Sequence, residues 1–171
     1  SYGKHDTLSL EEDFLPHILS GQNVGLLSEA GLPCIADPGS KIVEYAHNFQ
    51  IDVVPFVGPS SILLALMASG MNGQNFAFTG YLPIDKSDRT RALRNLESLT
   101  KKTGQTQIFM ETPYRNNQLI ETILKTCSNN TKLCIASDIT LPSENIKTKT
   151  IAEWKQEKIN INKKPAIFLI N

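Results

Sequence analysis

A short apolar run that ends in a loop of small residues, glycines and prolines constrains this chain more than any other feature. The run, residues 24–27, leads into the loop 28–39, and a helical pattern begins at Ser40. A strand, a ligand-sized loop and a helix in this order are typical of open α/β sheets, which bind ligands at the carboxyl ends of their strands. Glu29 lies where the strand would deliver it into that crevice, and Gly31 lets backbone approach a ligand closely. An ordinary βα turn is the alternative for this loop taken alone.

Strands and helices alternate along the rest of the chain. Apolar runs or polar–apolar alternation predict strands at residues 24–27, 52–56, 75–81, 106–110, 132–139 and 166–170, and a further strand is expected at 147–151. Helical spacing predicts helices at residues 8–19, 41–49, 60–69, 90–101 and 116–127. In the first half this alternation implies a parallel sheet with right-handed crossovers. The polar residues 84–89 follow Pro83 and predict a linker, so we expect an α/β fold with domains at residues 1–83 and 84–171.

Four blocks with sensible spacing carry a family resemblance. They read Ser-Glu-Ala-Gly-Leu-Pro with Asp-Pro-Gly at residues 28–39, Gly-Pro-Ser at 58–60, Gly-Tyr-Leu-Pro at 80–83 and Glu-Thr-Pro-Tyr-Arg at 111–115. In this order they resemble the tetrapyrrole methylase superfamily, the class III S-adenosylmethionine-dependent methyltransferases. The resemblance is greatest to the branch that contains the bacterial 16S ribosomal RNA 2′-O-methyltransferase.

The resemblance implies two α/β domains of tetrapyrrole-methylase type. The N-terminal domain would hold a parallel sheet, the smaller C-terminal domain a mixed sheet, and the cofactor would lie in the cleft between them. Family members begin with a further strand, Gly-rich loop and helix that have no counterpart before Ser1. We therefore expect that an N-terminal portion is absent from this sequence and that its first sheet is incomplete. The resemblance also implies a homodimer.

Nine residues are candidates to contact S-adenosylmethionine, the first six because they match family positions and the last three because they lie at the expected cleft between the domains. They are Glu29, Ala30, Gly31, Leu32, Ser61, Ile62, Tyr81, Leu82 and Met110. Alternatives remain open: Glu29 could cap its own loop, Ser61 could be a plain helix cap, and Met110 could be a core residue.

Glu111 and Arg115 are the candidate catalytic residues, because an alcohol acceptor gains from a base near the oxygen that forms the new bond. An internal ion pair that fixes the turn between them is the alternative. The ribosomal branch has Ala-Arg-Glu-x-Thr-Lys in its next strand, where this chain has Ser137 and Leu141 in place of the basic residues. Because Arg and Lys contacts to phosphate dominate nucleic-acid affinity, this difference weakens the RNA assignment and leaves the cofactor assignment unchanged.

Composition limits the remaining choices. Lys plus Arg and Asp plus Glu number 17 each, so net charge gives no support for an extended nucleic-acid footprint. The three cysteines have no zinc spacing, which predicts no metal site, and no apolar stretch has the length of a membrane span. We predict a cytoplasmic S-adenosylmethionine-dependent methyltransferase that acts on RNA, with ribosomal RNA as the candidate, or on an unidentified small-molecule or protein acceptor. A tetrapyrrole (precorrin-type) methylase and an inactive cofactor-binding or assembly module of the same fold are the alternatives.

Overall fold

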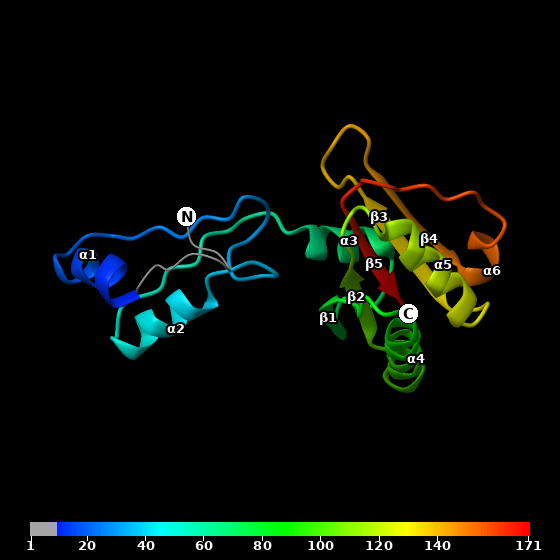
Figure 1. Ribbon diagram of the computed structural model, residues 1–171, viewed down its shortest axis with the longest axis horizontal. Helices are drawn as coiled ribbons and strands as arrows, with labels where there is room; N and C mark the ends of the chain where they lie inside the picture. Colours follow the sequence, from blue (N-terminus) through cyan, green and yellow to red (C-terminus); the bar gives the residue numbers. More distant parts are fainter. Residues whose placement is uncertain (1–9) are drawn as a thin grey trace. The chain divides into compact units, whose positions relative to one another are not determined.

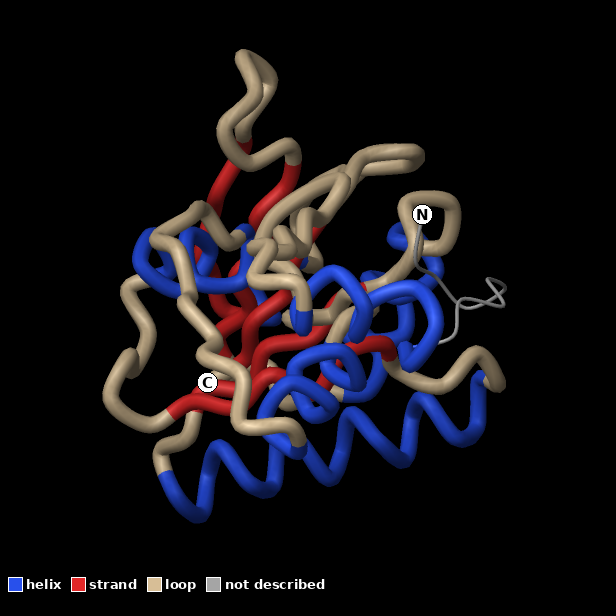
Figure 2. Tube along the Cα trace, turned by 90° about the vertical axis from the view of Figure 1, so that its left-hand side faces the viewer, coloured by secondary structure: helices blue, strands red, loops and turns tan. Residues whose placement is uncertain are grey.

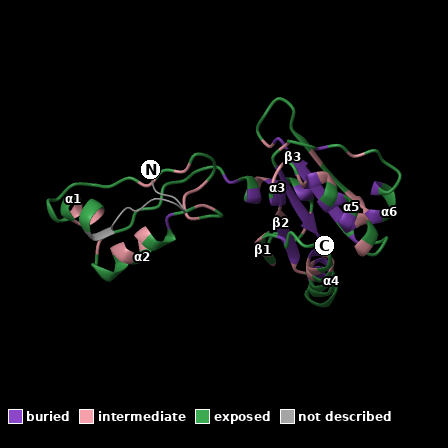
Figure 3. Cartoon of the chain, viewed as in Figure 1, coloured by how far each residue is buried: buried purple, intermediate pink, exposed green. Residues whose placement is uncertain are grey.

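The computed structural model describes residues 10–171 of the chain. It divides into two compact units, of which the first ends at Ser60 and the second spans Ser61–Asn171. Figure 1 labels the α-helices and β-strands of both units. Buried residues are concentrated in the second unit (Figure 3), whereas between residues 12 and 59 only Gly39 is buried.

The second unit is built around a five-stranded mixed sheet. Its strands are β1 (Phe76–Tyr81), β2 (Thr106–Met110), β3 (Lys132–Ser137), β4 (Asn145–Thr150) and β5 (Ala166–Ile170). The order across the sheet is β1-β2-β5-β3-β4, with β1 parallel to β2 and every other neighbouring pair antiparallel. The strands are drawn in red in Figure 2. The mixed sheet and the α/β class are confirmed.

Helices cover both faces of this sheet and create two cores. The helices are α3 (Ser61–Ser69), α4 (Lys86–Thr103), α5 (Asn116–Thr126) and α6 (Ile151–Trp154). Phe109 and Phe168 join the core formed with α4, α5 and α6, and Ile108 and Leu169 join the core formed with α3. Successive strand residues point to opposite faces, so a sheet covered on both faces needs apolar residues at every position. This explains the apolar runs at residues 108–110 of β2, 133–136 of β3 and 166–170 of β5.

Helix α4 begins earlier than the sequence predicts. The Asp85 side chain accepts hydrogen bonds from the backbone nitrogens of Ser87 (2.8 Å) and Asp88 (3.0 Å), and it therefore caps the helix. Gly104 ends the helix in the left-handed conformation, with φ of 65°. The linker predicted at residues 84–89 is wrong, because a capped and exposed first turn is as polar as a linker.

The first unit contains short helices joined by long extended segments. Its elements are the π-helical turn η1 (Leu10–Phe14), α1 (Leu15–Leu19) and α2 (Ser40–Asn48), and no strand is formed among residues 10–60. The strands predicted at 24–27 and 52–56, and the parallel sheet they would form, are therefore wrong for the described chain. A strand requires a hydrogen-bonded neighbour, and these segments have none; Leu27 and Phe56 are 90% and 88% exposed.

Across the described residues, no helix is both long and apolar enough to cross a membrane.

The observed division at Ser60 differs from the domain boundary predicted after Pro83. Strand β1 pairs with β2, and α3 packs on the same sheet, so both elements belong to the second unit. The division into residues 1–83 and 84–171 remains a prediction for the complete fold.

Glu97 of α4 joins this helix to the segment that precedes β3. Its Oε1 accepts hydrogen bonds from the backbone nitrogen of Ser128 (2.7 Å) and the hydroxyl of Thr131, and Lys101 Nζ lies 3.3 Å away. Burial raises the pKa of Glu97, but the hydrogen bonds from Thr131 and Ser128 and the charge of Lys101 outweigh it. The net result is a pKa below the usual value.

We expect the substitution Glu97→Gln to lower the free energy of unfolding by about 2 kcal/mol at neutral pH, since hydrogen bonds to a charged group are lost. A lowered folded-state pKa stabilises the protein above the unfolded-state pKa, near 4.5, and this contribution disappears as pH falls below that value. The difference between wild type and variant should therefore shrink in acid, as measured by denaturant unfolding across pH. Glu121→Gln, on the exposed face of α5, is the control. A difference for Glu97→Gln that stays constant with pH would contradict this expectation.

Candidate functional site

The carboxyl ends of three strands meet at one edge of the second unit's sheet. β1 and β2 are parallel, and β3 runs in the same direction because β2 and β3 are both antiparallel to β5. Leu82, Glu111 and Asp138 follow these strands directly, so all three lie at this edge together with the start of β5. Strand ends of this kind are where α/β sheets bind ligands.

Glu111 is held rigidly at this edge. Its Oε1 accepts hydrogen bonds from the backbone nitrogen of Thr112 (2.7 Å) and from Arg115 through Nε (3.0 Å) and Nη2 (2.7 Å). The Glu111 side chain is only 1% exposed, against 30% for Arg115. Oε2 of Glu111 has no hydrogen-bond partner among the described residues. One carboxylate oxygen is thus committed to the ion pair, whereas the other is buried, so the surrounding groups must move before it can accept a proton from a bound molecule.

The turn between these two residues is fixed by contacts from the segment before β5. The backbone nitrogen of Arg115 bonds to the Thr112 carbonyl (2.9 Å), and the carbonyl of Pro113 accepts from the backbone nitrogen of Lys163 (3.0 Å). Asn116, the first residue of α5, donates from Nδ2 to the Lys164 carbonyl at 2.6 Å. The backbone that carries Glu111 and Arg115 is therefore fixed by a hydrogen bond within the turn and by two hydrogen bonds with Lys163 and Lys164.

Asp138 forms a second polar cluster at the same edge. Its Oδ2 lies 2.6 Å from Lys164 Nζ and 2.9 Å from the hydroxyl of Ser143. Lys164, and after it the Ser143 hydroxyl, lower the pKa of Asp138 below its usual value. Asp138 is thus held as a carboxylate. A ligand that bound to Asp138 would have to displace Lys164 and Ser143 or share the carboxylate with them.

The predicted cofactor residues of β1 and β2 are placed differently from one another. Tyr81 is opposite Met110 in the parallel pair, and its side chain is 57% exposed. Met110 is half-buried against the α3 core, while Leu82 is buried in the core on the α4 face. Tyr81 thus offers the accessible side chain, and a contact from Leu82 would come from its backbone.

Ser61 and Ile62 open helix α3 in the second unit. Ser61 is exposed, whereas Ile62 is 7% exposed and packs in the core with Leu66.

A separate open hollow of about 320 Å³ lies between α3 and the β3–β4 connection. It is lined by Leu64, Met67, Ala68, Ile139, Thr140, Glu144 and Ile146, none of which is a predicted site residue.

Most of the chain matches the model of a known protein family. The family is described as Tetrapyrrole (Corrin/Porphyrin) Methylases, and its model matches residues 11–155. The chain belongs to the tetrapyrrole methylase family. The resemblance inferred from the four sequence blocks is therefore confirmed.

Curated tetrapyrrole methylases similar to this chain are named ribosomal RNA small subunit methyltransferase I. The protein from Halalkalibacterium halodurans is 32% identical over 92% of this chain and 54% of its own length. The protein from Bacillus subtilis is also 32% identical, over 92% of this chain and 53% of its own length. The chain thus spans about half the length of the curated relatives it matches.

Two solved tetrapyrrole methylase structures support the fold. The methyltransferase CobJ superposes with a TM-score of 0.60 at 15% identity, covering 91% of this chain and 67% of CobJ. The cobalt precorrin-4 methyltransferase CbiF gives a TM-score of 0.59 at 16% identity, covering 98% of this chain and 72% of CbiF. At these identities the likeness concerns the fold alone.

The remaining predicted residues lie in the first unit, in the loop that carries the first family block. Glu29, Ala30 and Gly31 are exposed and Leu32 is half-buried. The hydroxyl of Ser28 accepts a hydrogen bond from the Ala30 backbone nitrogen (3.3 Å) and donates to its carbonyl (2.9 Å). Glu29 makes no hydrogen bond in the part of the chain that the structure describes, so the loop is capped by Ser28 and the alternative role for Glu29 is disfavoured.

The first and second family blocks touch each other within this unit. A Cβ atom on Gly58 would lie 2.8 Å from Cδ2 of Leu32, so a larger residue there would require the Leu32 side chain to move. Gly39 has φ of 133°, and a Cβ there would lie 2.6 Å from Cδ2 of Leu26. The glycines of both blocks therefore permit close packing of the loop that presents Glu29.

Sequence reasoning did not identify Lys164 as a partner of Asp138. The two residues are 26 positions apart and meet only because the end of β3 pairs with the start of β5. The only signal in the sequence was that Lys164 is a basic residue just before the last predicted strand. Its pairing with Asp138 cannot be inferred until the strand order is known.

Proposed function

We propose that this protein is an S-adenosylmethionine-dependent methyltransferase that acts on ribosomal RNA of the small subunit. The observation that carries the proposal is the identity of 32% over 92% of the chain with relatives named ribosomal RNA small subunit methyltransferase I. The exposed loop of Glu29 and the polar strand ends at Glu111 and Asp138 are consistent with it. A homodimer and a cytoplasmic location remain parts of the same proposal.

The residues of the first unit fit a sulfonium nucleoside with an amino-acid tail. The Glu29 carboxylate is exposed and can accept hydrogen bonds from an ammonium or a ribose hydroxyl. Backbone groups of Ala30, Gly31 and Leu32 adjoin it, and the tight Gly58–Leu32 approach gives the loop a defined shape. Within the second unit, the proposed cofactor contacts are the backbone amides of Ser61 and Ile62 at the start of α3, together with Tyr81, Leu82 and Met110.

Glu111 and Arg115 would serve the methyl acceptor. When bound, the cofactor supplies a methyl group activated by the positive sulfur. Oε2 of Glu111, the carboxylate oxygen that Arg115 does not bind, would accept the proton that the acceptor hydroxyl loses. Arg115 fixes the orientation of the carboxylate, so the alignment needed for an in-line transfer is built into the turn.

The proposal is tested with calorimetry of S-adenosylmethionine binding and with transfer of a labelled methyl group to small ribosomal subunits. We expect Glu29→Gln to weaken cofactor binding by about 10- to 100-fold, because a charge-assisted hydrogen bond is lost. Glu44→Gln, which changes an exposed glutamate on α2, should have no effect and is the matched control.

Three results would contradict parts of the proposal. Absence of cofactor binding by the full-length protein would overturn it entirely. Methyl transfer to a porphyrinoid and not to ribosomal RNA would favour the precorrin-type alternative. Cofactor binding without transfer to either acceptor would favour an inactive binding or assembly module.

A further inference from the structure

The segment that returns from α6 to β5 is strongly basic. Residues 155–164, which we call the lysine loop, read Lys-Gln-Glu-Lys-Ile-Asn-Ile-Asn-Lys-Lys. The loop holds four lysines against one glutamate, in a chain whose acidic and basic residues balance at 17 each. It runs from orange to red in Figure 1, between α6 and β5. A local excess of charge of this kind is an electrostatic footprint for an anionic partner.

The backbone of the lysine loop is anchored along its length. Ile161 is buried in the core, and its backbone nitrogen donates to Oδ1 of Asn117 at 3.1 Å. Asn160 accepts from Nδ2 of Asn117 at 3.0 Å, and Lys163 donates from its backbone nitrogen to the carbonyl of Pro113 at 3.0 Å. The lysines therefore project from an ordered backbone, which lowers the entropy lost when they bind.

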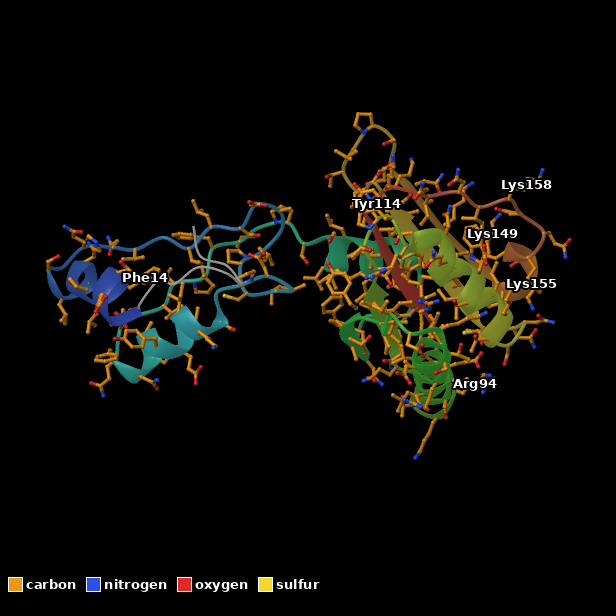
Figure 4. The ribbon with its side chains drawn as sticks, in the orientation of Figure 1. Phe14, Arg94, Tyr114, Lys149, Lys155 and Lys158 are labelled. Carbon is orange, nitrogen blue, oxygen red and sulfur yellow. The ribbon has the colours of Figure 1, made fainter. Side chains whose placement is uncertain are left out.

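Three of these lysines are not paired with an acidic side chain among the described residues, so their charges are available to a binding partner. Glu157 is paired with Lys149 of β4, and Lys164 is paired with Asp138. Lys155 bonds only to the neutral amide oxygen of Asn129, at 2.7 Å. Lys158 and Lys163 form no ion pair within residues 10–171. Lys155, Lys158 and Lys163 are all exposed. Figure 4 labels Lys155 and Lys158, together with Lys149 of β4, on the same side of the second unit.

The lysine loop ends at the candidate catalytic turn. The Pro113 carbonyl that anchors Lys163 lies between Glu111 and Arg115, and the next residue, Tyr114, is 73% exposed. An exposed aromatic ring is a surface on which an unpaired RNA base stacks. A row of cations that leads to such a ring, and then to a carboxylate, suits a single-stranded nucleic acid better than a compact anion.

We propose that the lysine loop binds the phosphate backbone of the RNA substrate and leads the strand to Tyr114 and Glu111. The proposal rests on the proposed function, because it assigns a binding surface for that acceptor. It also accounts for the missing basic residues at Ser137 and Leu141, since the positive charge absent from the end of β3 is present on the adjoining loop. Protection of an edge strand explains lysines on β4 but not those on the loop.

The test compares two charge-matched triple variants of the full-length protein. One combines Lys155→Gln, Lys158→Gln and Lys163→Gln. The control combines Lys86→Gln, Lys102→Gln and Lys125→Gln, which change exposed lysines of α4 and α5. Binding of a fluorescein-labelled single-stranded segment of 16S ribosomal RNA is followed by anisotropy over a range of salt concentrations.

We expect the loop variant to reduce the slope of log affinity against log salt by about 2, because three phosphate contacts are lost, at about 0.7 each. This corresponds to about 100-fold weaker binding at about 0.1 M salt. The control should keep the slope of the wild type, and both variants should bind S-adenosylmethionine as the wild type does.

Two outcomes would overturn the inference. Equal salt slopes for the two variants would show that the loop lysines only solvate the surface. Loop-dependent binding to phosphatidylcholine vesicles that contain phosphatidylserine, without loop-dependent RNA binding, would assign the loop to a membrane. Failure of the proposed function is distinguished by calorimetry, because loss of cofactor binding in the wild type leaves the RNA measurement unaffected.

Discussion

Replacement of Arg115 by methionine should lower the free energy of unfolding of the second unit by about 3–5 kcal/mol. Glu111 is almost fully buried, and Arg115 supplies two of the three hydrogen bonds to its Oε1. Methionine keeps the volume of the side chain but leaves a buried carboxylate without its counter-charge. Removing one partner of a buried pair is costly because the desolvation of the other partner is no longer offset.

The matched control is Arg91→Met on helix α4. Arg91 Nη2 lies 2.7 Å from Oδ1 of Asp88, the same separation as in the Arg115–Glu111 pair, but the two side chains are 73% and 46% exposed. Exposed pairs contribute about 0–1 kcal/mol, so the control should change little in urea unfolding. Adding Glu111→Gln to Arg115→Met should restore part of the loss, since the unpaired charge is then removed. Equal losses for Arg115→Met and Arg91→Met would contradict the expectation.

The sequence predicts the second unit well because its local signals agree with its packing. The strands predicted at residues 106–110 and 166–170 have the observed bounds, and the helix predicted at 116–127 ends one residue early. Each of these segments lies against the sheet or within it, so its apolar pattern reflects the core that it contacts. The polar start of α4 was missed because the cap at Asp85 depends on one side chain and not on a pattern.

The first unit shows where local signals are insufficient. Residues 24–27 and 52–56 are as apolar as the strands of the second unit, yet they form no ladder in the described chain. Strand formation depends on a neighbour as well as on apolar composition, and Val54, 69% exposed, has none here. The apolar pattern of a segment shows which residues it can bury. The pattern does not show which other element, if any, packs against those residues.

The candidate site was predictable where its contacts are local. Glu111 and Arg115 are four positions apart, and the sequence places them in one turn as either a catalytic or a structural pair. The lysine loop and the Asp138–Lys164 pair depend on the antiparallel pairing of β3 with β5, which brings residues far apart in sequence to one edge. Such contacts follow from strand order, which the sequence pattern alone leaves open.

The substitution Glu111→Gln separates the catalytic role of this residue from its structural role. The amide oxygen of glutamine can accept the same three hydrogen bonds that Oε1 accepts from Thr112 and Arg115. The amide nitrogen then replaces Oε2, so the oxygen that has no partner among the described residues becomes a donor that cannot take a proton. If Oε2 is the base, turnover in methyl transfer should fall by about 10²- to 10⁴-fold.

The accompanying measurements decide between the two roles. We expect the affinity for S-adenosylmethionine to be unchanged, and the loss in unfolding free energy to be smaller than for Arg115→Met, because Glu111→Gln leaves no buried charge. A variant that keeps wild-type turnover, or whose activity falls only in proportion to its folded fraction, would show that Glu111 serves to hold the turn. Arg115 would then be a structural partner, and the base would have to come from another group.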